Sequence, residues 1–301
     1  MSPRHVLLAT LVAALWGFNF VVIDVGLGEL PPFAFATLRF VAAGLPAVFF
    51  VRRPAVAWRW IISVGLFVGV GQFGLLFVGM HLGMPAGLSS VVLQAQVVFT
   101  MLFASVLLRE KPRTIQIAGM AIALAGVAIV GFNVGKASPL LAFLLCVGAA
   151  AMWGLGNVAM RKARPNDAFG FMVWMSLVPP LPFLLLSAIF EGPTAVVDAL
   201  GAMTVTGFAA LAYIAYISTL VGFGAWGWLM RRYDAGQVAM YSLLVPPFGL
   251  ASAAIVLGES ITAGNLLAAT LIVGGVGLGS VRLRTSRVIA GARPSPTPAR
   301  P

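Results

Sequence analysis

Charged residues are scarce in this sequence. Asp, Glu, Lys and Arg together make up 9% of the 301 residues, whereas 60% of the residues are hydrophobic. An ordinary soluble domain carries about 25% charged residues. So few charges cannot cover a water-exposed surface, which excludes the one or two soluble domains that the length alone would allow. A lipid-facing exterior removes this difficulty, so the composition predicts an integral membrane protein.

Groups that carry catalysis or bind metal are also few. Cys146 is the one cysteine, which excludes a disulfide within the chain and a metal site built from several cysteines. The two histidines, His5 and His81, lie near the ends of apolar runs, and no acidic residue lies in the middle of such a run. An enzyme needs a nucleophile with a base, paired carboxylates or metal ligands within reach of one another. We therefore predict that the chain is not an enzyme and has no cofactor and no metal.

The net charge of +11 raises the alternative of a nucleic-acid partner. However, the basic residues lie singly or in small groups between apolar runs, as in the loops of membrane proteins. Seventeen of the 19 Lys and Arg residues fall on one side of the predicted membrane topology, Lys136 falls on the other, and Arg39 lies within a span. The positive-inside rule then places both termini in the cytoplasm, and the partner is expected to be lipid rather than nucleic acid.

Long apolar runs bounded by charge, Pro or Gly recur along the chain. A bilayer core needs about 20 apolar helical residues, and no alternation of the β-barrel type is present. The sequence therefore predicts an all-α membrane fold of ten transmembrane helices, with spans at 6–26, 33–51, 60–81, 86–108, 114–132, 139–160, 170–190, 205–228, 235–257 and 263–281.

A weak internal repeat relates the two halves of the chain. Residues 85–131 align with 234–280 at an offset of 149 residues, and Glu110 and Glu259 fall in register at equivalent helix ends. Trp16 to Asn19 is echoed by Trp153 to Asn157. Five helices per repeat is an odd number, so the second repeat enters the membrane from the opposite face, and the two inverted repeats enclose a central cavity. We expect repeats over 1–132 and 133–284, followed by a disordered basic tail, 285–301.

Several short motifs carry a family resemblance over residues 5 to about 284. They are Trp16-Gly17-Phe18-Asn19-Phe20-Val21-Val22, Pro31-Pro32, Leu38-Arg39-Phe40, Met84-Pro85-Ala86-Gly87-Leu88, Leu93-Gln94-Ala95-Gln96 and Leu243-Leu244-Val245-Pro246. With these motifs the sequence resembles the EamA branch of the drug/metabolite transporter superfamily, and within it the exporters of cysteine and O-acetylserine. The resemblance implies ten helices in two inverted repeats and efflux of a small metabolite, and we expect the membrane to be a bacterial inner membrane.

Polar residues deep in the spans are candidates for the substrate site, because each needs a partner or water. Asn19 and Asn157 occupy equivalent positions in the repeat and are expected on opposite walls of the cavity, although each amide is also able to join helices. Arg39 is expected to pair with Asp24 or with a substrate carboxylate. The remaining candidates are Trp16, Gln72, Gln94, Gln96, Trp153, Tyr216 and Tyr241.

Two of these candidates constrain each other, because Gln94 and Gln96 lie about 200° apart on a regular helix. At most one of them is then expected to face the centre.

The predicted function is that of a secondary transporter that exports small polar metabolites, with cysteine and O-acetylserine as the substrates that the resemblance implies. Export of drugs or other metabolites on the same fold is the main alternative, and a membrane-embedded enzyme is a weaker one. Asp24, Glu110 and Glu259 all lie near the predicted interfaces. Coupling to protons and the choice between a monomer and a homodimer therefore stay open.

Overall fold

The computed structural model describes residues 1–134 and 139–280, and every regular element in these residues is a helix. Nine helices in them are long and apolar enough to cross a membrane, and the 17-residue helix Pro32–Val48 is a shorter apolar tenth. The all-helical membrane fold and its ten helices thus agree with the sequence prediction. The predicted tail at 285–301 and Lys136 lie outside the described residues.

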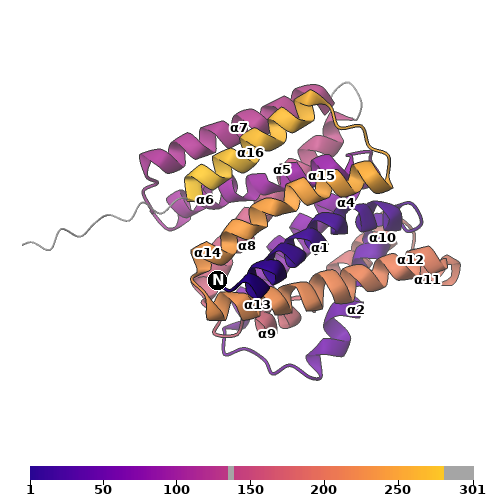
Figure 1. The fold of residues 1–301 in the computed structure, drawn as a ribbon. Helices are drawn as coiled ribbons and strands as arrows, with labels where there is room; N and C mark the ends of the chain where they lie inside the picture. The colour runs from indigo at the N-terminus through magenta and orange to yellow at the C-terminus, as the bar shows by residue number, and fades with distance from the viewer. Residues whose placement is uncertain (135–138, 281–301) are drawn as a thin grey trace, which may run out of the picture.

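The first five crossings, taken in chain order, make up the first helix group, and in space they interleave with crossings of the second half: Thr114–Val134 packs along Ala263–Ser280, and Pro3–Leu27 along Val245–Val256 (Figure 1). Several crossings are divided by a short irregular segment about midway along their length. In chain order the elements are α1 (Pro3–Leu27), α2 (Pro32–Val48), α3 (Trp58–Val64) with α4 (Phe73–His81), α5 (Ala86–Val92) with α6 (Gln96–Leu107), and α7 (Thr114–Val134). The second crossing was predicted to reach residue 51 but ends at Val48, two residues after Pro46, which removes a backbone donor from its last turn.

The second five crossings repeat this arrangement. Their elements are α8 (Leu140–Ala163), α9 (Ala168–Met175) with α10 (Pro180–Phe190), α12 (Val205–Ala212) with α13 (Gly222–Arg232), α14 (Ala235–Ala239) with α15 (Val245–Val256), and α16 (Ala263–Ser280). A further short helix, α11 (Ala195–Ala202), was not predicted. The break between α9 and α10 falls at the Pro179-Pro180 pair, and α15 begins at the residue before Pro246-Pro247, because proline is tolerated in a first helical turn but not inside a helix.

The irregular segments recur at the repeat distance. A π-helical segment, Gly65–Gln72, divides the third crossing, and a second one, Tyr213–Val221, divides the eighth. A 3-10 segment, Leu93–Ala95, divides the fourth crossing, and Met240–Leu244 divides the ninth. The starts of the two π segments are 148 residues apart. Such interruptions are common at functional sites, and here they cluster in the middle of the bundle.

Helices α7 and α16 lie side by side at the edge of the molecule (Figure 1). Small residues allow their backbones to meet: a Cβ atom on Gly119 would lie 2.5 Å from the carbonyl oxygen of Gly275. Close backbone approach of this kind favours helix association in membranes. The pair therefore joins the last crossing of each five-helix group.

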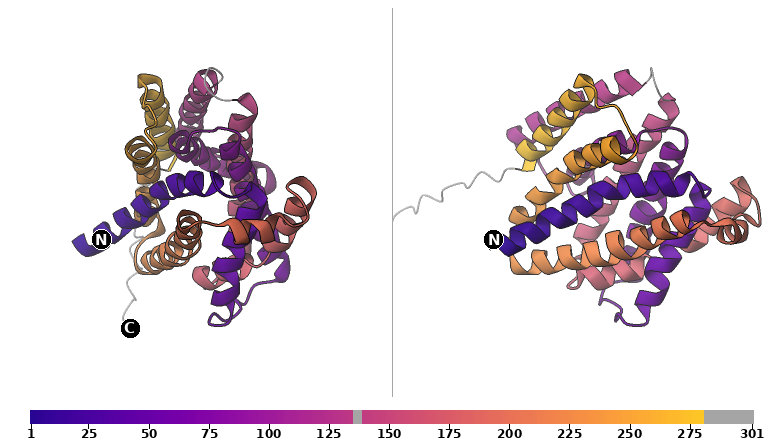
Figure 2. Two further views of the ribbon diagram at one scale, coloured as in Figure 1. Left: turned by 90° about the vertical axis from the view of Figure 1, so that its right-hand side faces the viewer. Right: turned by 45° about the vertical axis from the view of Figure 1, so that its right-hand side comes forward.

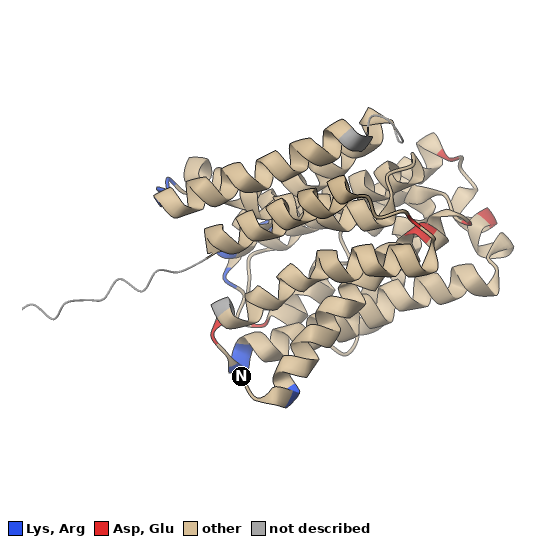
Figure 3. Cartoon of the chain, turned by 45° about the horizontal axis from the view of Figure 1, so that its top comes forward, with Lys and Arg blue, Asp and Glu red and all other residues tan. Residues whose placement is uncertain are grey.

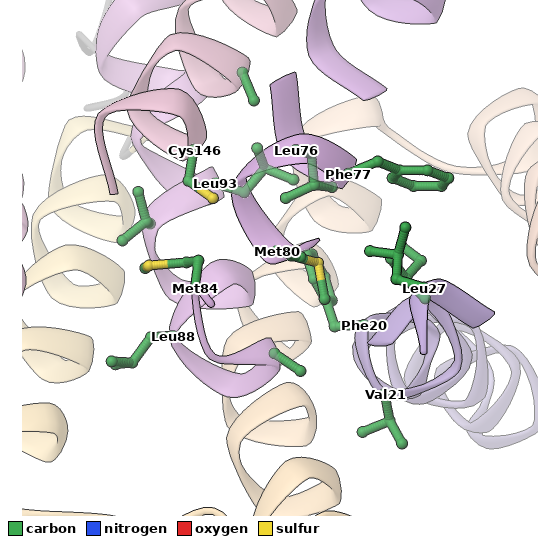
Figure 4. Packing of buried hydrophobic residues seen from close by; sticks show 14 of the residues in the cluster. Phe20, Val21, Leu27, Leu76, Phe77, Met80, Met84, Leu88, Leu93 and Cys146 are labelled. Atoms are coloured by element: carbon green, nitrogen blue, oxygen red, sulfur yellow. The ribbon is translucent and has the colours of Figure 1, made fainter. Parts of the chain in front are cut away.

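Helix α1 runs through the interior, between α15 and the eighth crossing, in both views of Figure 2. The main apolar core packs around it and around α2 and α4, where Phe35 and Phe77 are fully buried. Figure 4 shows part of this core, including Phe20, Met80 and Cys146. Many large apolar side chains instead face outward, among them Phe50 at 89% exposure, as expected of a surface covered by lipid.

The two ends of the bundle differ in charge (Figure 3). We call the end that carries Arg4, Arg53, Arg161 and Arg232 the basic face, and the end that carries Glu29, Glu191, Asp198 and Glu259 the acidic face. At the acidic face the carboxylates hold helix starts: Glu191 accepts hydrogen bonds from the backbone N–H groups of Phe33 and Ala34 at 2.6 and 2.9 Å. A carboxylate is favoured at a helix N-terminus by the helix dipole and the free N–H groups.

Candidate functional site

A cavity of about 440 Å³ lies between the two groups of five helices. It is lined by parts of the first, second, third, fourth, sixth, eighth and ninth crossings. Eight of the ten candidate residues line it: Trp16, Asn19, Arg39, Gln72, Gln94, Gln96, Trp153 and Asn157. All the Asn, Gln and Arg residues that were candidates from the sequence thus line this one cavity. An unpaired polar group is too costly on a lipid-facing surface, which explains why these residues gather here.

Tyr216 and Tyr241 do not line the cavity, which corrects the sequence expectation for both. Tyr216 lies in the π-helical segment and is 42% exposed, whereas Ser218 and Thr219 of the same segment face the cavity. A π segment changes the rotation per residue, so the face expected from a regular helix is wrong there. Tyr241 packs instead with a small apolar cluster around Ala9 and Leu229.

Arg39 is a buried cation with incomplete hydrogen bonding. Its side chain is 3% exposed, Nη2 donates to Thr219 Oγ1 at 3.2 Å, and Nε and Nη1 have no hydrogen-bond partner. The guanidinium carbon lies 3.8 Å from the centre of the Phe73 ring and 4.7 Å from that of Phe40. The rings stabilise the charge through their π faces, but they satisfy neither free donor.

The predicted pair between Arg39 and Asp24 is not formed. Arg39 Nη2 bonds to Thr219 instead, and its Nε and Nη1 have no partner. Asp24 lies in the last turn of α1 near the acidic face, whereas Arg39 lies two turns into α2 and turns towards the middle of the bundle. The sequence predicted either Asp24 or a substrate carboxylate as the partner of Arg39. The geometry rules out Asp24 and is compatible with a substrate carboxylate.

Asn19 and Asn157 both line the cavity, but they are bonded differently. The Oδ1 atom of Asn19 is buried and has no hydrogen-bond partner. The Nδ2 atom of Asn157 donates to Gln96 Oε1 at 2.7 Å and to Thr100 Oγ1 at 3.0 Å, which joins α8 to α6. Asn157 therefore acts as an interhelical link as well as a lining residue, while the acceptor of Asn19 is unpaired.

Gln94 and Gln96 both reach the cavity, although at most one was expected to face it. The 3-10 segment Leu93–Ala95 lies between the two helical parts of this crossing and changes their rotational phase. Gln94 Nε2 also donates to the backbone carbonyl of Ser242 at 3.3 Å, which links the two repeat-related 3-10 segments.

Aromatic rings form much of the remaining wall. Trp16 donates from Nε1 to the carbonyl of Ser218 at 3.1 Å and lies within 5.1 Å of the rings of Phe223 and Trp226. Phe223 and Trp226 were not candidates from the sequence. Their spacing of three residues on one helix face was the available signal, but the same spacing is common in ordinary packing.

The lining residues include no Asp or Glu, so Arg39 is the formal charge on the wall. Among the described residues, no group of three or more His, Cys, Asp or Glu side chains is placed to hold a metal ion. Two of the lining residues, Arg39 and Asn19, thus hold unpaired donors and an unpaired acceptor that are buried beside the cavity, and aromatic rings form much of its wall. The cavity is suited to reversible binding of a small anionic or zwitterionic molecule rather than to covalent chemistry.

Comparison with known families agrees with this arrangement. The profile of the EamA-like transporter family matches residues 4–132 and again 140–281. The chain belongs to the EamA-like transporter family. As a member of this family it is a multi-pass membrane transporter and not an enzyme. The two matched segments correspond to the two groups of five helices, so this EamA-family chain contains the family unit twice.

Individual relatives of this EamA-family protein match it over nearly their full length. A "probable amino-acid metabolite efflux pump" of Salmonella typhimurium is 40% identical over 95% of this chain and 98% of its own. The Escherichia coli protein of the same name is 38% identical over 96% and 99% of the two chains. A crystal structure that is 22% identical, with a TM-score of 0.61, covers 92% of this chain and 98% of its own, and so supports the fold.

Proposed function

We propose that the protein exports small α-amino-acid metabolites, of the size of cysteine and O-acetylserine, across a bacterial inner membrane. The names of the two bacterial relatives point to this substrate class. The basic face, which carries Arg4, Arg161 and Arg232, is then cytoplasmic, as the positive-inside rule requires. The acidic face lies towards the periplasm, and substrate moves from the basic to the acidic face.

The observation that carries the proposal is the pair of free donors on Arg39, which lines a cavity whose lining includes no carboxylate. A buried charge whose hydrogen bonds are unmade is costly, and a ligand that satisfies it recovers that free energy. The flat guanidinium fork suits the two oxygens of a carboxylate. Arg39 is therefore assigned to the substrate carboxylate.

Asn19 supplies the complementary group. Its free Oδ1 is an acceptor, and the ammonium of an amino acid is a donor that carries three N–H groups. The buried side-chain atoms without a partner in the described residues all belong to Asn19 and Arg39, and both residues line the cavity. One unpaired acceptor beside unpaired cationic donors is the hydrogen-bonding complement of a zwitterion.

The cavity has room for these substrates. Its volume of about 440 Å³ falls within the usual range for small-molecule sites, about 300–1,000 Å³. The aromatic wall formed by Trp16, Phe223 and Trp226 faces the part of the substrate beyond the zwitterion. The same wall would suit flat apolar drugs, which would bind to the rings without using Arg39. The experiment below therefore also tests the alternative of drug export.

The proposal is tested by efflux from proteoliposomes loaded with labelled cysteine or O-acetylserine. Arg39→Gln removes the charge, Arg39→Lys keeps it without the fork, and Arg52→Gln neutralises an exposed arginine as the matched control. We expect Arg39→Gln to abolish efflux, Arg39→Lys to reduce it strongly, and the control to transport normally. If Arg39→Gln exports amino acids at the parental rate, or if only apolar drugs are exported, the proposal is wrong.

A further inference from the structure

Glu259 joins the two groups of helices at the acidic face. It follows α15 in the second group, and its carboxylate accepts hydrogen bonds from the backbone N–H groups of Ala86 at 2.7 Å and Gly87 at 3.1 Å, at the start of α5 in the first group. The fourth crossing, which begins there, continues to Leu107. The carboxylate is thus bound by two free N–H groups at the positive end of a transmembrane helix.

The repeat places Glu110 in an equivalent loop at the basic face. The backbone N–H of Glu259 donates to the carbonyl of Ala253 at 3.3 Å, and that of Glu110 donates to the carbonyl of Ala104, 149 residues earlier, at 3.4 Å. Each glutamate follows a residue with positive φ, 69° at Gly258 and 55° at Arg109. The two loops therefore share one backbone geometry at opposite ends of the protein.

The two carboxylates nevertheless have different surroundings. Glu259 is half-buried against α5, whereas Glu110 is exposed and pairs with Arg161, with Nη2 to Oε1 at 2.7 Å and Nη1 to Oε2 at 3.2 Å. Both side chains of that pair are about half exposed, at 50% and 48%. An exposed ion pair contributes about 0–1 kcal/mol, so Glu110 is able to exchange Arg161 for another partner at little cost.

Helix packing shows the same asymmetry. At the acidic face α5 packs closely along α15: a Cβ atom on Gly87 would lie 3.3 Å from that of Ala253, and one on Gly249 would overlap Ser90. The repeat-related elements at the basic face are α6 and the start of the ninth crossing. Residues 237–244 make no comparable packing against α6. Among the residues whose side chains are described, the fourth and ninth crossings therefore pack closely at the acidic face.

We propose that Glu259 and Glu110 are reciprocal latches of two gates. In the conformation described here Glu259 holds the fourth and ninth crossings together and closes the cavity at the acidic face. When the cavity opens there, Glu259 leaves α5, and Glu110 leaves Arg161 and binds the backbone N–H groups at the start of the ninth crossing, which closes the basic face. This inference goes beyond the proposed substrate and does not depend on it.

The contact between the Glu259 carboxylate and α5 includes opposing effects that allow the carboxylate to leave α5. Burial raises the pKa of its carboxyl, the N–H donors of Gly87 and Ala86 act in the opposite direction, and the negative charge of Asp24 adds a smaller increase. Desolvation therefore disfavours the charged carboxylate in this contact, whereas the two hydrogen bonds favour it. When Glu259 leaves α5 for water its carboxylate regains hydration, which favours release.

The test measures accessibility without any substrate. The reporter is Ser218→Cys, in the cavity wall, in a Cys146→Ala background, and the probe is a membrane-impermeant maleimide. It is added to spheroplasts, which expose the predicted periplasmic face, and to inside-out vesicles, which expose the other. Asp198→Cys at the acidic face and Arg52→Cys at the basic face report which face each preparation presents.

Glu259→Gln should raise labelling from the acidic face about tenfold and lower it from the basic face, because an amide cannot accept both N–H groups. Glu110→Gln and Arg161→Gln break the same ion pair but should act in opposite directions. Loss of Glu110 removes the latch at the basic face and should lower labelling from the acidic face. Loss of Arg161 leaves Glu110 free to bind the start of the ninth crossing and should raise labelling from the acidic face.

Two results would overturn the proposal. One is a Glu259→Gln protein whose labelling from both faces stays within about twofold of the parent, or rises from both faces together, which would indicate general loosening. The other is a shift in the same direction for Glu110→Gln and Arg161→Gln. The second comparison leaves Glu259 intact, so it decides the question even if Glu259→Gln fails to fold.

Discussion

Arg39 Nη2 lies 3.2 Å from Thr219 Oγ1, and this hydrogen bond joins α2 of the first helix group to the π-helical segment of the second. Thr219 also donates to the carbonyl of Ile214 at 2.8 Å, five residues earlier, as a π-helical turn allows. The threonine thereby fixes the direction of the guanidinium and leaves Nε and Nη1 free. We infer that Thr219 positions Arg39 for the substrate.

Replacing Thr219 by Val should therefore weaken substrate binding while the fold is retained. The substitution keeps the shape of the side chain and removes the hydrogen-bond acceptor, so one more donor on Arg39 is left unpaired. We expect the apparent KM for efflux to rise about fivefold to tenfold, corresponding to about 1–1.4 kcal/mol. Thr206→Val, at an exposed position near the acidic face, is the control. An unchanged KM would show that Thr219 does not position Arg39.

Asn19→Leu and Asn157→Leu should differ in their effects, although the two residues occupy equivalent positions in the repeat. Asn19→Leu removes a free acceptor, so export should be lost while thermal stability is unchanged. Asn157→Leu removes two interhelical hydrogen bonds, so we expect a loss of stability together with a loss of export. Efflux and thermal unfolding in detergent measure the two effects. If Asn19→Leu exports normally, its amide has no role in the substrate site.

The α7–α16 contact gives a prediction about stability from two adjacent glycines. A Cβ atom on Gly275 would lie 2.6 Å from the backbone of Ala123, whereas one on Gly274 would meet no atom within 4 Å. Gly274→Ala should stabilise α16 by up to about 1 kcal/mol, because alanine favours a helix. Gly275→Ala should lower the Tm instead, because the helices must separate. Equal effects of the two variants would contradict this packing.

The orientation is tested by reporters at both ends of the chain. The charge bias predicts that Met1 and Pro301 are cytoplasmic. Green fluorescent protein fused after Pro301 should therefore fluoresce, and alkaline phosphatase at the same position should be inactive. Phosphatase inserted after Gly192, at the acidic face, should be active. A phosphatase that is active after Pro301 would reverse the assignment of the two faces.

Much of the fold follows from simple rules that act along the chain. Apolar length, charge asymmetry and the 149-residue offset predict the ten helices, and polar residues in the spans predict most of the cavity wall, because lipid tolerates neither charge nor unpaired backbone groups. The limits of the two repeats, 1–132 and 133–284, stay a prediction.

The errors arise where local geometry departs from a regular helix. The π segment turns Tyr216 to the outside, and the 3-10 segment brings Gln94 and Gln96 to one cavity. The absence of an Arg39–Asp24 pair depends on how far α2 turns towards the bundle centre, which sequence spacing does not specify. The short helix α11 was missed because eight residues are too few to show clear periodicity.

The central claim is that Arg39 binds a carboxylate while Asn19 accepts from an ammonium group. The most direct measurement is the binding of three related compounds to the purified protein by isothermal titration calorimetry: cysteine, cysteamine, which lacks the carboxylate, and 3-mercaptopropionate, which lacks the amine. We predict that the parent protein binds cysteine at least about tenfold more tightly than either analogue. In Arg39→Gln the preference for cysteine over cysteamine should disappear. Equal binding of cysteine and cysteamine by the parent protein would contradict the assignment.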